Sequence, residues 1–132
     1  MKSMMIVAVV SGFAFTLNAQ SVDGKELFVK KCATCHSLTI PQDKSKMKAP
    51  PARGVMFHMR EAFGSDEKIK AHILDFVIEP SREKAICKSV KRFGVMPSLK
   101  GKVSQDELSV IADWMIKNLQ MNQAEHQKMQ GK

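Results

Sequence analysis

The apolar residues of this chain recur at helical spacing, and no stretch alternates apolar and polar positions as a strand does. The clearest helix begins at Ser104, which can form a capping box with Glu107. Its apolar face continues at intervals of three and four residues to Leu119. Another helix is predicted between Ser65, a capping residue, and Pro80, because apolar residues recur there at the same intervals.

Two further helices have weaker patterns. One falls within residues 21–35, where Asp23 can cap its start. The other begins at Ser81 and continues through Phe93 to a stop at Gly94. Together these elements predict an all-α fold of about four short helices. Such a fold has a thin core for this length of chain, which indicates that another group fills it.

Two segments lack a helical pattern. Residues 38–51 are polar and contain three of the prolines, so we expect an irregular loop there. Residues 120–132 are also polar, and we expect them to form a frayed C-terminal tail.

The composition indicates one domain, and the first 19 residues indicate export. The 132-residue chain is 44% hydrophobic and 26% charged, which suits a single folded domain. Residues 1–19 contain Lys2, a short apolar run that ends at Leu17, and the small residue Ala19, which together are typical of a secretory signal peptide. We predict cleavage after Ala19, a domain at residues 20–119 and a periplasmic location. An uncleaved membrane anchor is the alternative, against which the shortness of the apolar run argues.

The strongest chemical signal is the sequence Cys32-Ala33-Thr34-Cys35-His36. Two cysteines separated by two residues and followed by histidine are the attachment sequence of c-type haem. The two thiols can form thioethers with the vinyl groups of one porphyrin, and the histidine can then bind the iron as an axial ligand. The single motif predicts one haem c, covalently bound through Cys32 and Cys35, with His36 on the metal. The apolar ring would also complete the thin core.

Two other chemistries use a similar pair of cysteines. A dithiol of thioredoxin type needs alternating strands and helices, which the pattern does not predict. A zinc site could join the pair to His36 and Cys87, but zinc sites usually repeat the close spacing and this chain does not. Cys87 is an odd thiol whose simplest interpretation is a small buried apolar residue. A disulfide-linked partner and a redox-sensitive thiol are the alternatives.

Met96 is the candidate for the second axial ligand. It follows a predicted helix end in the sequence Phe93-Gly94-Val95-Met96-Pro97. Gly94 allows a turn there, and Pro97 biases Met96 towards an extended backbone, so this loop can hold a thioether against a buried metal. Methionine is a common axial ligand that raises the reduction potential. A methionine packed on the haem edge is the alternative interpretation, and His58 is the next candidate ligand.

These motifs make the chain resemble the class I monohaem cytochromes c over roughly residues 22–119. The matching residues are Gly24-Lys25-Glu26-Leu27-Phe28 before the haem motif, Ala49-Pro50-Pro51, Met96-Pro97, and Trp114 in the final helix. The resemblance implies the cytochrome c fold around one haem, in which Gly24 and Phe28 cross the last helix at Trp114. It also implies that the carbonyl of Pro50 or Pro51 accepts a hydrogen bond from His36 and so orients this ligand.

The positive charge of the chain indicates what kind of partner it binds. The formal net charge is +8, and many lysines lie near the predicted haem surroundings, so acidic redox proteins are the expected partners. Membrane-bound respiratory complexes are possible partners, whereas nucleic acid is not expected because basic and aromatic residues are not interleaved. We predict an electron carrier rather than an enzyme. The alternatives are a haem subunit of a larger periplasmic oxidoreductase, for example in sulfur-compound oxidation, and a haem that binds or senses a ligand.

Overall fold

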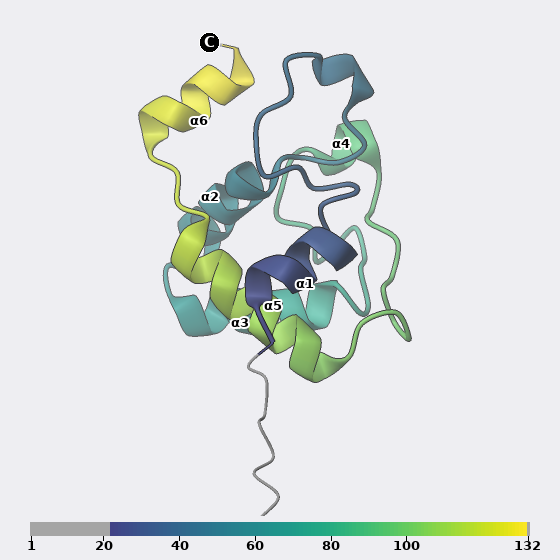
Figure 1. The fold of residues 1–132 in the computed structure, drawn as a ribbon. Helices are drawn as coiled ribbons and strands as arrows, with labels where there is room; N and C mark the ends of the chain where they lie inside the picture. Colours follow the sequence, from purple (N-terminus) through teal and green to yellow (C-terminus); the bar gives the residue numbers. More distant parts are fainter. Residues whose placement is uncertain (1–21, 132) are drawn as a thin grey trace, which may run out of the picture.

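The computed structural model describes residues 22–131, and within that range it is helical without a strand. The predicted all-α fold class is therefore confirmed, while the predicted signal peptide, residues 1–19, lies outside the described residues. Figure 1 shows the arrangement. The helices are α1 (Gly24–Lys31), α2 (Ala52–Phe63), α3 (Asp66–Phe76), α4 (Val90–Phe93), α5 (Gln105–Asn118) and α6 (Gln123–Gln130), with a short 3-10 turn at Lys44–Lys46. No helix among residues 22–131 is long and apolar enough to cross a membrane.

The helix α1 crosses α5, as Figure 1 shows. The Asp23 side chain accepts a hydrogen bond from the Lys25 N–H and so caps the start of α1, as the sequence predicts. The rings of Phe28 and Trp114 lie 5.4 Å apart at this crossing, measured between their centroids. The implied contact of Gly24 and Phe28 with Trp114 is therefore confirmed.

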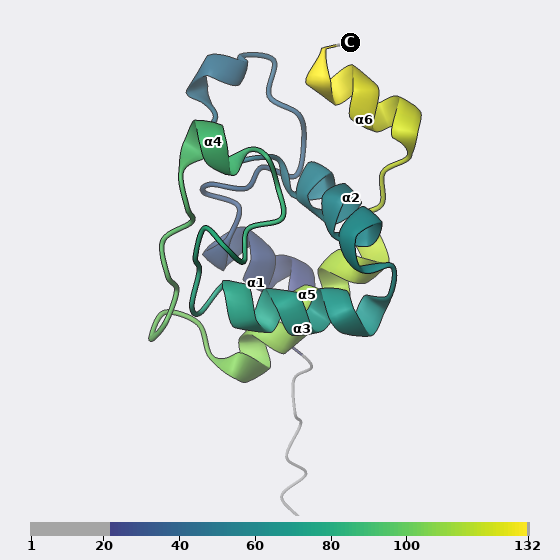
Figure 2. The ribbon, with the colours of Figure 1, turned by 180° about the vertical axis from the view of Figure 1, so that it is seen from behind.

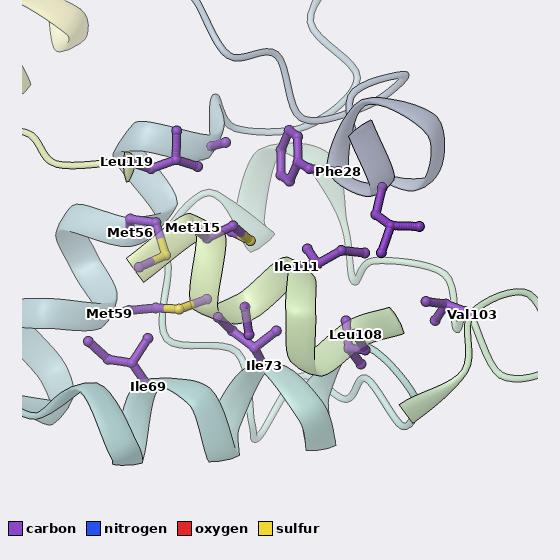
Figure 3. Close-up of a cluster of buried hydrophobic side chains, with 13 residues drawn as sticks. Phe28, Met56, Met59, Ile69, Ile73, Val103, Leu108, Ile111, Met115 and Leu119 are labelled. Atoms are coloured by element: carbon purple, nitrogen blue, oxygen red, sulfur yellow. The ribbon is translucent and has the colours of Figure 1, made fainter. Parts of the chain in front are cut away.

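The core lies around α5, between α1 on one side and α3 on the other. Figure 3 shows Ile111 and Met115 of α5 among side chains from the neighbouring helices. Phe28 reaches this cluster from α1, Met56 from α2 and Ile69 from α3, and each of the three is 1% exposed or less. Burial of such a side chain stabilises the fold by about 1.5–3 kcal/mol, so the hydrophobic effect joins α1, α2 and α3 in one core around α5.

The starts of α3 and α5 agree with the sequence. Ser65 caps α3 by accepting a hydrogen bond from Lys68 N–H, and α3 ends before Pro80. At the start of α5, Ser104 and Glu107 form both hydrogen bonds of the predicted capping box, at 3.1 and 2.8 Å.

The helix α2 occupies residues 52–63, to which the sequence pattern assigns no element. Ala52, Met56 and Met59 form its buried face at intervals of four and three residues, and Phe63 packs against the core one turn later. Gly64 ends the helix in the left-handed conformation, with φ of 70°. Helical spacing and a terminal glycine were therefore the signals for this helix.

The helix predicted from Ser81 to Phe93 is wrong for most of its length, because only Val90–Phe93 is helical. Ser81 caps a short turn by accepting a hydrogen bond from Lys84 N–H. Ala85, Ile86 and Cys87 follow, and all three line an apolar cavity beside the core. Consecutive helical residues point in directions about 100° apart, so a helix could not turn all three side chains inwards.

The expectation of a frayed tail is also wrong. Residues 123–130 form α6, which starts with a capping box between Asn122 and Glu125 and packs against α2. Arg53 of α2 fixes this position, because its guanidinium group donates to the Gln120 carbonyl and pairs with the Glu125 carboxylate at 3.0 Å.

Candidate cofactor site

One apolar cavity of about 240 Å³ lies beside the core. Phe28, Ile73 and Ile111 line it from α1, α3 and α5, and the segment 85–97 closes another side. Five of the six residues predicted to hold the haem line this cavity, namely Cys32, Cys35, His36, Pro50 and Met96, and the sixth, Pro51, does not. The cavity therefore joins the cysteine motif to a methionine that lies far from it in the sequence.

The cysteine motif forms a turn directly after α1. The N–H of Cys32 donates to the Phe28 carbonyl at 2.8 Å and ends the helix, and the N–H of His36 donates to the Cys32 carbonyl at 2.9 Å. This winding keeps Cys32 and Cys35 one turn apart on the cavity side, since both line it. Burial raises the pKa of the Cys32 thiol to about 11, so this thiol is protonated at neutral pH.

His36 is oriented by the polar loop that follows it. Its Nδ1 atom donates to the Pro50 carbonyl at 2.8 Å, which leaves Nε2 as the ring nitrogen with a free lone pair. Burial lowers the pKa of His36, and the hydrogen bond to Pro50 opposes this shift only in part, so the ring is neutral near pH 7. The acceptor is Pro50 rather than Pro51, which directly precedes α2.

A backbone hydrogen bond closes this polar loop into a ring. The Ala52 N–H donates to the Ser37 carbonyl at 2.9 Å, so both ends of residues 37–52 are held together. Pro50 lies inside the closed segment and is thereby fixed relative to His36.

The Met96 loop is held by the two residues that follow α3. Gly94 begins the loop with φ of 78°, a conformation that favours glycine. Ser98 Oγ then donates to the Ile78 carbonyl at 2.5 Å, and the Leu99 N–H donates to the Val77 carbonyl at 3.0 Å. These two bonds fix the chain just after Met96, which lines the cavity from this loop.

The structure also places His58, the second candidate ligand, and His72, which the sequence analysis does not single out. His58 is not among the residues that line the cavity, and it packs instead against His126 of α6. His72 does line the cavity, between the rings of Phe63 at 4.8 Å and Phe76 at 5.3 Å. The spacing of four residues between His72 and Phe76 was the available signal, because it places both on one helix face.

Cys87 also lines the cavity and is half-buried. Burial raises the pKa of its thiol to about 11, against a smaller opposing effect from a hydrogen bond with Ser89. It forms no disulfide with another cysteine of the described residues. A protonated, half-buried thiol agrees with the interpretation of Cys87 as a small apolar residue.

The side chains around the cavity fit a covalently attached haem. Two thiols one turn apart suit the two vinyl groups, the Nε2 lone pair of His36 suits an iron, and the apolar walls suit the porphyrin plane. The zinc alternative has no geometric support, since no three His, Cys, Asp or Glu side chains of residues 22–131 are grouped to hold a metal ion.

Fold and cavity thus define a small helical protein that is equipped to hold one prosthetic group covalently. The cytochrome c family model matches residues 21–131, and the chain belongs to the cytochrome c family, whose members are electron-transfer proteins with covalently bound haem. A protein of Aquifex aeolicus (strain VF5), described as uncharacterized, is 27% identical over 125 residues, which cover 83% of this chain and 82% of the relative. No solved structure gives a significant match.

Proposed function

We propose that this protein is a periplasmic electron carrier with one haem c, bound through Cys32 and Cys35 and ligated by His36 and Met96. The observation that carries the proposal is the shared cavity: the cysteine motif and the Met96 loop line the same apolar space. A haem there supplies an iron that accepts and releases one electron at a time. No substrate is transformed in this function.

The residues of the chain keep the two ligands in place. Pro50 fixes the orientation of the His36 ring through the Nδ1 hydrogen bond, and Ser98 anchors the loop that carries Met96. Ligands that are held in this way move little when the charge on the metal changes. Little rearrangement favours rapid electron exchange, which is what a carrier requires.

Positive charge at the cavity supports acidic redox proteins as partners, and membrane-bound respiratory complexes are candidates among them. Lys31 and Lys48 both line the cavity, and the chain carries a formal net charge of +8. Opposite charge on a partner would raise the rate of encounter and orient the cavity towards it.

The test is the optical spectrum of the purified holoprotein beside that of its Met96→Leu variant. We expect a weak near-infrared band in the oxidised wild type, which reports a thioether on ferric haem, and its complete loss in the variant. Met47→Leu is the matched control, because Met47 does not line this cavity and the band should persist in that variant.

Two results would contradict the proposal. Met59 and Met115 also line the cavity, so a band that survives in Met96→Leu and disappears on substitution of either one would assign the ligand elsewhere. A high-spin wild-type spectrum, or one that shifts when carbon monoxide is added, would instead indicate a haem that binds or senses a ligand.

A further inference from the structure

The C-terminal helix α6 buries one side chain against the rest of the molecule, and that side chain can be charged. His126 is 5% exposed, and the structure gives α6 no other buried residue within its bounds, 123–130. Figure 1 shows α6 at one end of the molecule, away from α1 and α3. Besides the surface contacts of Arg53 and Lys44, its attachment to α2 therefore depends on the state of a buried histidine rather than on an aliphatic core.

The ring of His126 is enclosed by aromatic groups of α2. It stacks on Phe57, with ring centroids 4.1 Å apart and 17° between the planes, and it meets His58 edge-on at 4.7 Å. Its Nε2 atom lies 3.2 Å from Nε2 of Gln130, an amide nitrogen that can only donate. His126 Nε2 is therefore the acceptor and carries no proton, so the docked ring is neutral.

The charged groups around His126 come from α2, α6 and the preceding loop. On α2 these are Arg53, His58 and Glu61, and the Glu61 carboxylate lies 3.4 Å from His58 Nδ1. On α6 they are Glu125 and Lys128, and from the loop before α2 Lys44 Nζ donates to the Met129 carbonyl at 2.8 Å. Burial lowers the pKa of His126 most, a charge on His58 lowers it further, and Glu61 opposes both.

The acidic contact of α6 does not titrate in the same range. The backbone hydrogen bond from Asn122 and the bond from Arg53 hold the pKa of Glu125 below its usual value. Arg53 and Glu125 thus both keep their charges at the mildly acidic pH at which histidines take up protons, so this ion pair is not what a fall in pH weakens first. Acidification changes the histidines first.

We propose that α6 is a pH-sensitive strap, which docks on α2 while His126 is neutral and is released when His126 takes up a proton. The direction of this pH dependence follows from the linkage between proton binding and docking. The released strap binds a proton more readily than the docked one, so docking is complete above the pKa of a free histidine, about 6.5, and weakens as the pH falls below it. With one proton taken up, the ratio of docked to released strap falls about tenfold for each pH unit.

Release of the strap would change contacts on the cofactor side of the molecule, because Lys44 contacts both the strap and α4. The same residue that donates to Met129 accepts, through its carbonyl, a hydrogen bond of 2.6 Å from Arg92 of α4. Figure 2 shows α4 beside the loop that contains Lys44. The strap is thereby linked to the loop that carries Pro50 and to the helix that precedes Met96.

The experiment is an NMR titration of the reduced holoprotein from about pH 8 to about pH 4.5, a range that brackets histidine protonation. Backbone shifts of residues 123–130 report the strap, and those of α5 report the rest of the fold. We expect helical shifts of α6 to disappear in a transition of one proton while α5 stays folded. His126→Phe retains an aromatic ring that cannot be charged, so its strap should stay docked throughout.

Gln127→Ala is the matched control, because Gln127 is an exposed residue of the same helix and its substitution should leave the transition unchanged. His58→Gln removes a neighbouring positive charge and should move the transition to lower pH. The proposal would be overturned if α6 stayed docked over the whole range, if His126→Phe were released at the same pH as the wild type, or if α6 and α5 unfolded together.

Discussion

Gly24 occupies the point where α1 crosses α5, and its missing side chain lets the two helices approach. A Cβ atom at this position would overlap Trp114 Cβ and lie 2.8 Å from the Val110 carbonyl oxygen. A backbone carbonyl cannot turn aside as a flexible side chain can, so the helices would have to separate. The same contact keeps Phe28 against Trp114, and Phe28 lines the cofactor cavity.

The Gly24→Ala substitution should destabilise the holoprotein by about 1–3 kcal/mol, the usual range for overpacking a core. Denaturant unfolding monitored by Trp114 fluorescence measures this difference. Gly54→Ala is the control, because its Cβ would meet only the flexible end of Met129 and alanine favours the helix. Equal losses in both variants would show that the crossing at Gly24 tolerates a side chain.

The sequence predicted the roles of single residues better than it predicted the elements. The spacing of Cys32, Cys35 and His36 is local, so the motif could be recognised without knowledge of the fold. The choice between Pro50 and Pro51 could not be made this way, because it depends on which carbonyl faces the ring of His36 after the loop has closed. His72 was missed for a similar reason, since only the packing of α3 on the cavity shows that it lines the wall.

At the scale of the elements, local signals predicted helix starts and tertiary contacts decided the rest. Side-chain caps placed α1, α3 and α5 correctly, because each cap is a hydrogen bond within one turn. The segment from Ser81 instead wraps the cavity, and α6 is ordered by Arg53 and by the rings of α2. Neither effect can be identified from the residues of those segments alone.

Loss of the capping box of α5 should destabilise more of the fold than loss of another helix cap, because α5 contacts both α1 and α3. Ser104→Ala removes the acceptor for the Glu107 N–H and should lower the free energy of unfolding by about 1 kcal/mol. Thermal or denaturant unfolding of the holoprotein is the measurement. Thr39→Ala removes a hydroxyl group from an exposed loop position, so this control should change stability little. Equal losses in the two variants would contradict a special role for the capping box.

At the scale of the whole molecule, the cavity explains the thin core inferred from the sequence. Core side chains of α1, α3 and α5 also line the cavity, and the segment 85–97 lies on another side of it. The fold therefore places its prosthetic group where a larger protein would place further helices. The same arrangement leaves Lys31 and Lys48 at the cavity, so a partner that approaches the haem meets positive charge.

This distribution of charge predicts how electron transfer depends on salt. With an acidic redox protein as partner, the bimolecular rate constant should fall as salt is added, because screening acts over about 10 Å at 0.1 M. Lys48→Glu and Lys117→Glu change the net charge equally, but only Lys48 lines the cavity. Stopped-flow measurements at low salt should therefore show a larger decrease for Lys48→Glu, and the two variants should converge at high salt. Equal decreases would mean that net charge alone attracts the partner, and an absence of salt dependence would exclude docking by charge at this face.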